Sequence, residues 1–331
     1  MDAFDTAEFE EYPSEAAWLA ARRQGIGSSD APALIGASKH RTPYEVFCEK
    51  IGLELPPPDP RNQELMAWGR ELEEPIFRRF QAMVPAYRLY KPTPHHNYVS
   101  KVEPWRRATI DGFALTAGHE EPGPVEIKWA PYLDPDDALL PGYQVQLQHQ
   151  MGILGAAWGV LVVFARSELV WFEQERHQGF LEALWGLEER FWRKVQRREP
   201  PELDGLPGTL AVLLARFPAP TPGFVKPLPE KALRWDAERQ HALIETRRWQ
   251  RVADEQKARL MEAIGDAEAG VLLDGTSYTW RLQTRAGYTV APSEHRDLRR
   301  RKGPLDLSAL LETLQPNQEE LSDAAETAAA T

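Results

Sequence analysis

The sequence predicts an α/β fold in which a mixed central sheet is flanked by helices. Two short segments rich in β-branched and aromatic residues, 109–113 and 125–129, are separated by turn-forming residues and therefore predict a β-hairpin. The run 158–165 is almost continuously apolar, which indicates a strand buried on both faces. The segments 63–82 and 143–157 carry apolar residues at helical spacing, so we expect helices beside the sheet.

Composition excludes several classes of protein. The chain has 331 residues, of which 42% are hydrophobic, so a sizeable core is possible. The single cysteine, Cys48, excludes an internal disulfide and a four-cysteine zinc or iron-sulfur site built from one chain. The net charge of −11 argues against a general nucleic-acid coat, although a local basic channel is compatible with it. The acidic N-terminus and the lack of a long apolar run predict a cytoplasmic protein without a membrane segment.

The N-terminal segment leads into a candidate phosphate-binding loop. We expect residues 1–12 to be loose, followed by a helix that Ser14 caps, that contains Arg22 and that the glycines at 25 and 27 end. Segment 25–31 then places glycines and two hydroxyls before another helical stretch. Exposed amides and hydroxyls at a helix N-terminus make a phosphate site, to which Arg22 can add charge. The alternative is that Ser28 or Ser29 is only an N-cap.

Two further helices precede the hairpin. Thr42-Pro43-Tyr44-Glu45 is a capping box with proline at the first helical position, and it predicts a helix that Gly52 ends. In the long helix 63–82, Glu73 lies within the apolar stripe, whereas Glu74 shares the other face with arginines. A carboxylate in an apolar stripe is costly unless it is paired or binds metal. Glu73 is therefore a candidate site residue, or else part of a salt bridge at the edge of the stripe.

The predicted hairpin carries the main chemistry. Side chains alternate across a strand, so Glu126 and Lys128 share one face while Ile127 points to the other. Asp111 on the adjacent strand can meet Glu126, and the Ile127 carbonyl is a possible further ligand. Such oxygen ligands suit Mg²⁺, which takes one or two protein carboxylates and keeps several waters. This pattern predicts a hydrolytic site for a phosphodiester, or alternatively only an exposed charged strand face.

Further extended segments and a further helix are also predicted. Extended segments at 88–91 and 98–101 precede the hairpin, and an antiparallel neighbour of the buried strand is expected at 169–172. Glutamines alternate through 144–150 at the start of the helix 143–157, where one of them can orient a water or a phosphate. A helix at 177–198 ends in basic residues.

The C-terminal third has a different composition. Proline-rich residues 217–229 predict a linker, and 231–264 predicts a charged helix with a thin apolar seam. A hairpin with a tight turn is expected over 271–282. The basic cluster Arg296 to Lys302 either binds DNA or is a solvated charge run. We expect residues 316–331 to be disordered.

Taken together, the segment from Trp18 to about Pro201 resembles the YqaJ viral recombinase family, relatives of the phage lambda exonuclease within the PD-(D/E)XK nuclease superfamily. The pieces that carry the resemblance occur in the family's order. They are Arg22 with Gly25-Ile26-Gly27-Ser28-Ser29-Asp30, the Thr42-Pro43-Tyr44-Glu45 helix start, Trp68-Gly69 followed by Glu73, Asp111-Gly112, Glu126-Ile127-Lys128, and Gln144 to His149. The resemblance implies a PD-(D/E)XK restriction-endonuclease-like core over more than half of the chain.

The resemblance also implies roles for individual residues. Asp111, Glu126 and the Ile127 carbonyl would hold Mg²⁺, for which Mn²⁺ substitutes. The remaining residues would have catalytic or binding roles: Lys128 orients the attacking water, Glu73 is a helix carboxylate near the metal, and Arg22 and Ser29 bind the 5′-terminal phosphate. Gln146 would be a further catalytic residue, because it matches the first residue of the group's Gln-x-x-x-Tyr motif, although Gln150 stands where the motif has tyrosine.

The sequence thus predicts a nuclease domain over 13–203, a Pro-rich linker over 204–230, a helix and hairpin appendage over 231–315, and a tail over 316–331. By resemblance, it would be a Mg²⁺-dependent 5′ to 3′ exonuclease on double-stranded DNA ends. It would work with a single-strand annealing protein in phage-type recombination and form a homo-oligomer, such as a ring-shaped trimer. The alternatives are an endonuclease or single-strand nuclease on the same fold, and a noncatalytic DNA-binding or partner-docking module.

Overall fold

The computed structural model describes residues 4–137, 139–284, 298 and 300. The chain divides into two compact units, Met1–Phe217 and Pro218–Thr331, which are described separately below. None of the helices in the described ranges has the length and apolar character needed to cross a membrane.

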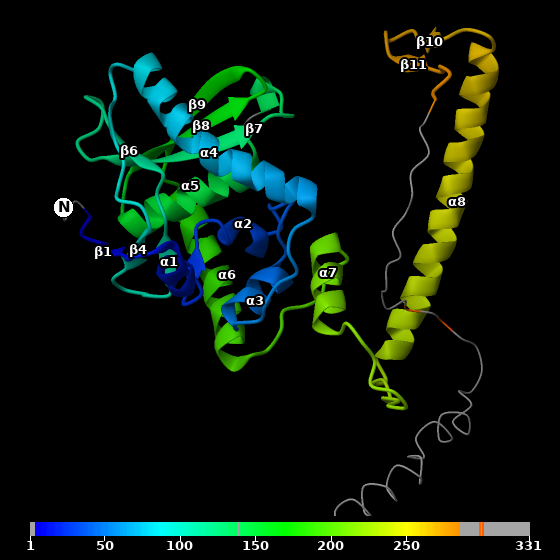
Figure 1. The fold of residues 1–331 in the computed structure, drawn as a ribbon, viewed down its shortest axis with the longest axis horizontal. Helices are drawn as coiled ribbons and strands as arrows, with labels where there is room; N and C mark the ends of the chain where they lie inside the picture. Colours follow the sequence, from blue (N-terminus) through cyan, green and yellow to red (C-terminus); the bar gives the residue numbers. More distant parts are fainter. Residues whose placement is uncertain (1–3, 138, 285–297, 299, 301–331) are drawn as a thin grey trace, which may run out of the picture. The chain divides into compact units, whose positions relative to one another are not determined.

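A five-stranded mixed sheet forms the centre of the N-terminal unit (Figure 1). Its strands, in spatial order, are β3 (Arg88–Tyr90), β6 (Gly112–Leu115), β7 (Gly123–Ala130), β8 (Trp158–Ala165) and β9 (Glu168–Glu175). Strands β7 and β8 are parallel, and the other neighbours are antiparallel. The predicted hairpin and the predicted antiparallel partner of the buried strand are both confirmed.

The two faces of this sheet are covered by α4 (Pro60–Met83) and α5 (Pro141–Leu154), as Figure 1 shows. Alternate residues of β8 belong to two separate apolar cores. Val160 and Val162 pack with Phe80 of α4, whereas Leu161 packs with Met151 of α5. Because apolar side chains are needed on both faces, the strand reads as a continuous apolar run. The predicted α/β class, a mixed sheet flanked by helices, is confirmed.

A second, four-stranded sheet was not predicted. Its strands, in spatial order, are β1 (Ala7–Glu11), β4 (His96–Ser100), β5 (Arg106–Ala108) and β2 (Ile26–Gly27). The expectation that residues 1–12 are loose is therefore wrong for β1, which pairs antiparallel with β4. Ala7 and the preceding Phe4 are buried in the core, so apolar burial fixes a segment whose composition is mostly acidic.

The remaining helices of this unit pack around the two sheets. They are α1 (Glu15–Arg22), α2 (Ala31–Leu34), α3 (Pro43–Lys50), the short 3₁₀ helix η1 (Pro135–Asp137) and α6 (Gln178–Arg197). Ser14 caps α1, and Thr42 and Glu45 form the predicted capping box of α3. Asp30 precedes α2 without a side-chain cap bond, so neither Ser28 nor Ser29 is its N-cap.

The boundary of the N-terminal unit differs from the prediction. Helix α7 (Pro207–Arg216) lies within the stretch 204–230 that was predicted to be a linker. Val212 of this helix is buried, and Thr209 Oγ1 donates to Thr42 Oγ1 over 3.0 Å. Helix α7 therefore belongs to the N-terminal unit, because its apolar face completes the core around α3.

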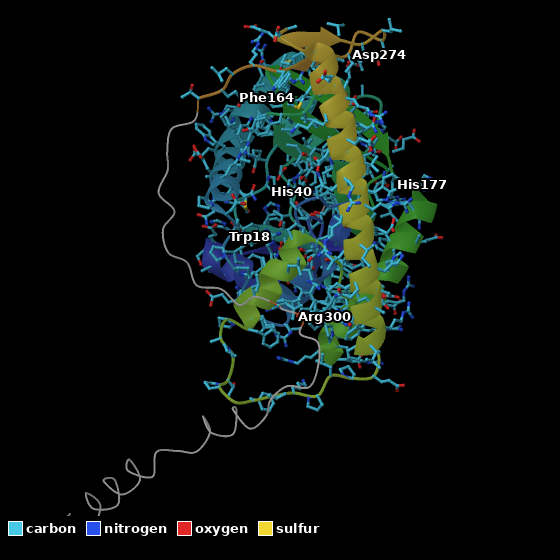
Figure 2. All side chains as sticks on the ribbon, turned by 90° about the vertical axis from the view of Figure 1, so that its right-hand side faces the viewer. Trp18, His40, Phe164, His177, Asp274 and Arg300 are labelled. Carbon is cyan, nitrogen blue, oxygen red and sulfur yellow. The ribbon has the colours of Figure 1, made fainter. Side chains whose placement is uncertain are left out.

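The C-terminal unit contains the predicted helix and hairpin. Helix α8 (Ala232–Ile264) is followed by β10 (Ala269–Val271) and β11 (Ser277–Thr279), which are antiparallel. Every described residue of α8 keeps some solvent exposure, and Figure 2 shows side chains along its whole length. Arg300, labelled in Figure 2, pairs with Asp236 of α8. Apart from Leu298 and Arg300, the basic cluster 296–302 and the tail 316–331 lie outside the described residues.

Candidate functional site

The β6–β7 hairpin brings Asp111 next to Glu126 and Ile127. Strand β6 begins at Gly112, which pairs with Val125, so Asp111 lies directly beyond the end of that pairing. The backbone N–H of Ile127 donates to Asp111 Oδ2 over 2.8 Å. Gly112 allows α4 to approach, because a Cβ atom there would lie 2.4 Å from the Phe77 ring. The hairpin and the close helix therefore fix the Asp111 carboxylate against β7.

Glu126 and Lys128 share the face of β7 that is covered by α5, as strand alternation predicts. Glu126 is only 1% exposed, and its two carboxylate oxygens have different partners. Oε1 forms an ion pair with Lys128 Nζ. Oε2 accepts a hydrogen bond from Gln150 Nε2 of α5 over 2.6 Å. The structure thus brings Asp111, Glu126, Ile127 and Lys128 together and adds Gln150.

The electrostatics of this cluster are unbalanced. Burial raises the pKa of Asp111 well above its ordinary value, and the nearby Glu126 and Glu73 raise it further. Burial alone would lower the pKa of Lys128, but Glu126 and Asp111 outweigh it, so that this pKa is raised. The ammonium group of Lys128 therefore faces the two carboxylates of Asp111 and Glu126, and the site favours an additional positive charge.

The residues present fit a divalent cation with oxygen ligands. A residue in a strand directs its N–H and C=O to the same side. Since the N–H of Ile127 points to Asp111, its carbonyl lies on that side as well, beyond the end of β6. Asp111, Glu126 and this carbonyl make a small oxygen set of the kind Mg²⁺ uses. In the described ranges, no three His, Cys, Asp or Glu residues form a metal-binding group, so a site of this kind relies on two carboxylates.

Glu73 is placed differently from the prediction of an inward-facing carboxylate. Its side chain is 37% exposed and forms an ion pair with Lys91 Nζ over 2.8 Å. Lys91 also pairs with Glu74, which in turn pairs with Arg78 as its helical position suggests. Glu73 is therefore at the edge of the apolar stripe, in the salt bridge that was the alternative interpretation, but it still raises the pKa of Asp111.

Gln150 is a residue of the site to which the sequence pattern assigned no role. The predicted Gln146 is half-buried, one helical turn before Gln150 on the same face of α5. Gln150 is completely buried and donates to Glu126 and to the Thr109 carbonyl, over 2.6 Å and 3.1 Å. The alternating glutamines were the signal, but the sequence does not tell which of them reaches the carboxylates.

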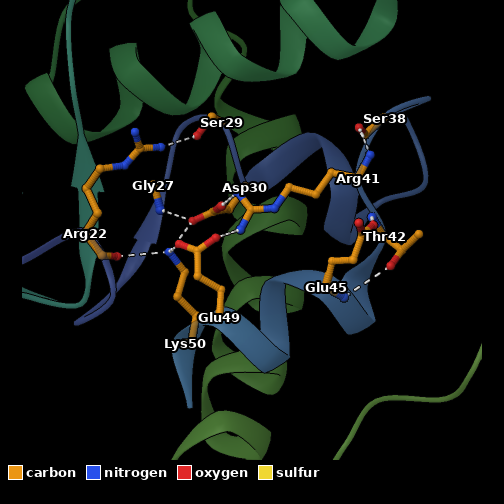
Figure 3. Close-up of polar contacts among 10 residues, drawn as sticks. All are labelled: Arg22, Gly27, Ser29, Asp30, Ser38, Arg41, Thr42, Glu45, Glu49 and Lys50. Carbon is orange, nitrogen blue, oxygen red and sulfur yellow. Dashed lines mark hydrogen bonds and ion pairs between the residues drawn. The ribbon is translucent and has the colours of Figure 1, made fainter. Parts of the chain in front are cut away.

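The predicted phosphate-binding residues also meet. Arg22 Nη2 of α1 donates to Ser29 Oγ over 2.7 Å, as Figure 3 shows. The guanidinium lies over the Trp18 ring, with its carbon 4.8 Å from the ring centroid. Because a guanidinium has five N–H donors, these contacts leave donors for an anion.

A buried ion cluster, which was not predicted from the sequence, supports this loop (Figure 3). Asp30 is fully buried and pairs with Lys50 and Arg41, over 2.7 Å and 2.5 Å. Burial alone would raise the pKa of Asp30, but Lys50 and Arg41 outweigh it and hold that pKa well below its usual range. Lys50 also donates to the Arg22 carbonyl, and Asp30 accepts from the Gly27 N–H. The cluster therefore ties the end of α1 to the loop that carries Ser29.

Comparison with known proteins identifies the region that contains both clusters. Residues 17–157 match the family model described as a YqaJ-like viral recombinase domain. All predicted site residues, from Arg22 to Gln146, lie inside the YqaJ-like domain, and so does Gln150. Strand β8, which pairs with β7 in the central sheet, follows the matched region.

Other relatives of the YqaJ-like domain extend the comparison. The uncharacterized protein YqaJ of Bacillus subtilis (strain 168) is 26% identical over 212 residues, which are 60% of this chain. The chain spans 62% of the length of that curated relative. Among solved structures, the chain is similar to an alkaline exonuclease (LHK-Exo) from Laribacter hongkongensis, with 17% identity and a TM-score of 0.41, covering 55% of this chain and 93% of that one. The complex of LHK-Exo with dAMP gives 16% identity and a TM-score of 0.43, with the same coverage.

Proposed function

We propose that the N-terminal unit is a metal-dependent deoxyribonuclease that hydrolyses the phosphodiester bonds of DNA. The observation that carries the proposal is the juxtaposition of Asp111, Glu126 and Lys128 on the β6–β7 hairpin. Two carboxylates and an ammonium group lie together beside β7, where its pairing with β6 ends. A surface that only binds DNA does not require this combination. The family match to a viral recombinase domain supports a role in DNA recombination.

Mg²⁺ is the proposed cofactor, with Mn²⁺ as a substitute. Asp111, Glu126 and the Ile127 carbonyl would hold the ion, which supplies positive charge to the phosphodiester and makes a water more acidic. The chain's own groups orient the reaction. Lys128 donates hydrogen bonds to the attacking water and stabilises the charge that develops on the phosphate oxygens. Glu73 is proposed to act indirectly, because its negative charge raises the pKa of Asp111.

The proposed substrate is a double-stranded DNA end that carries a 5′ phosphate. Arg22 offers charged N–H donors beside the Ser29 hydroxyl, and such donors bind phosphate strongly. Anchoring the 5′ end would let the enzyme digest from 5′ to 3′ and leave a 3′ single strand. A single-strand annealing protein is the proposed partner for that product, in a bacterial or phage-infected host cell. A ring-shaped homo-oligomer, such as a trimer, is the proposed assembly.

Digestion of end-labelled linear duplex DNA, with and without Mg²⁺, tests the activity. We expect hydrolysis that depends on the metal, starts at 5′-phosphorylated ends and spares closed circles. Equal digestion of circles and linear DNA would favour an endonuclease, and preference for unpaired DNA would favour a single-strand nuclease. Binding of DNA without hydrolysis, under any divalent metal, would reduce the protein to a DNA-binding module.

A further inference from the structure

Gln150 has an unsatisfied buried atom in the candidate site. The side chain is completely buried, and its Oε1 has no hydrogen-bond partner among the described residues. The orientation of the amide is fixed by chemistry, because the Glu126 carboxylate and the Thr109 carbonyl can only accept hydrogen bonds. The NH₂ group must face both of them, which leaves Oε1 as the free acceptor.

A free acceptor at this place requires a donor that the protein does not supply. Buried polar groups are hydrogen-bonded in almost all folded proteins, and exceptions mark sites for water, ions or ligands. Lys128, the ammonium group of the candidate site, is already paired with Glu126. Mg²⁺ in protein sites keeps several of its waters, and each such water has two O–H donors.

We infer that Gln150 is a positioning residue of the nuclease, whose Oε1 accepts a hydrogen bond from a water that hydrates the divalent cation. This inference rests on the proposed function, and it assigns a role to the residue that replaces the tyrosine of the family's Gln-x-x-x-Tyr pattern. The NH₂ group of the same side chain holds Glu126 and the Thr109 carbonyl. Thr109 lies two residues before Asp111, so one amide fixes the separation of the two proposed metal ligands.

The chain provides a matched control in the same helix. Gln148 is also buried, at 8% exposure, and both ends of its amide are satisfied away from the site. Its Nε2 donates to the Glu175 carbonyl, and its Oε1 accepts from the His177 N–H. Gln148→Met and Gln150→Met therefore each remove one side-chain amide from the same helix. Only Gln150→Met removes an amide that contacts a carboxylate of the candidate site.

The test measures Mn²⁺ binding to the DNA-free protein by electron paramagnetic resonance, together with kcat and KM for duplex ends. Outer partners of metal ligands typically contribute about 10- to 100-fold in metal affinity. We expect Gln150→Met to weaken Mn²⁺ binding by that factor and to lower kcat, while KM for DNA stays unchanged. Gln148→Met should lower the unfolding temperature and leave Mn²⁺ affinity as in the native protein.

Equal Mn²⁺ affinity in native protein and Gln150→Met would overturn the inference, and so would an equal loss in the two variants. If Gln150→Met does not fold, a crystal structure of the native protein with Mn²⁺ decides. A water within about 2.5–3.0 Å of Gln150 Oε1 and next to the ion supports the inference, and its absence refutes it. A native protein that binds no Mn²⁺ and digests no DNA would instead refute the proposed function.

Discussion

Two aspartates in the same unit have opposite electrostatic environments. Asp30 is fully buried between Lys50 and Arg41, which hold its pKa below the usual range. Asp111 is half-buried, and burial together with Glu126 and Glu73 raises its pKa. The first carboxylate is compensated by the protein, whereas the second has an excess of negative charge around it. The difference separates a cluster that holds the fold together from one that is suited to a cation.

The strongest test of this comparison is to remove a negative charge from the site of Asp111 and Glu126. Asp111→Asn or Glu126→Gln should abolish Mg²⁺-dependent hydrolysis, because each removes the negative charge of a proposed metal ligand. Digestion of labelled duplex ends measures this, with circular dichroism as the check on folding. Near-native turnover in a folded variant would show that the metal is held elsewhere.

The same variants also report on metal-free stability. A carboxyl group with a raised folded pKa stabilises the fold at low pH, and this contribution is lost as pH rises from about 4 through the folded pKa. Metal-free Asp111→Asn should therefore be at least as stable as the native protein at pH 7. Mg²⁺ at 100 times its Kd should stabilise the native protein by about 2.7 kcal/mol, and it should leave the variant unchanged.

The opposite change in stability is expected at the compensated site. Asp30→Asn removes the buried negative charge that pairs with Lys50 and Arg41, and breaking a buried ion pair costs about 3–5 kcal/mol. Urea unfolding followed by tryptophan fluorescence measures this loss. Because the folded pKa of Asp30 is lowered, its contribution is present above about pH 4 and is lost as pH falls below that value. Asp134→Asn, in the exposed pair with Arg166, is the control and should cost less than about 1 kcal/mol.

A smaller effect, on the preference for 5′-phosphorylated DNA ends, is expected at the loop that the Asp30 cluster supports. A charged hydrogen bond from Arg22 to phosphate contributes about 1.5–3 kcal/mol, and 1.4 kcal/mol corresponds to a factor of ten. The native enzyme should therefore prefer 5′-phosphorylated over 5′-hydroxyl ends by about 10- to 100-fold. Arg22→Ala should remove the preference by slowing only the phosphorylated substrate, as measured by initial rates at fixed salt.

The neighbouring Arg23 provides the control for this prediction, because it is exposed and one residue away. Arg23→Ala should keep the preference for phosphorylated ends. If Arg22→Ala slowed both substrates equally, Arg22 would be a structural residue beside the site.

The smallest effect distinguishes two adjacent carboxylates of α4. Glu73 and Glu74 both pair with Lys91, but only Glu73 contributes to the pKa of Asp111. Glu73→Gln should reduce hydrolysis, and Glu74→Gln should not. Both pairs are partly exposed, so each variant should change the free energy of unfolding by about 1 kcal/mol or less. Similar rates for the two variants would mean that the field of Glu73 does not matter to catalysis.

Local patterns in the sequence determined much of the fold and part of the site. The turn between two β-rich segments predicted the hairpin, and the two-residue alternation of a strand placed Glu126 and Lys128 on one face. The apolar run 158–165 predicted the buried strand, and Thr42 with Glu45 predicted the start of α3. Helix α7 was also detectable, because Leu210 to Ala215 is an apolar run that the proline-rich surroundings obscured.

Only the tertiary structure decided which side chains meet across elements. Gln146 and Gln150 share a face of α5, and the choice between them depends on how far the helix is shifted along the sheet. One turn of about 5.4 Å separates them, and no local pattern fixes that shift. In the same way, Lys91 reaches Glu73, and Lys50 reaches Asp30, from distant parts of the chain. The sequence fixes the period and face of each element, but packing between elements fixes their relative positions, and the site is built from those positions.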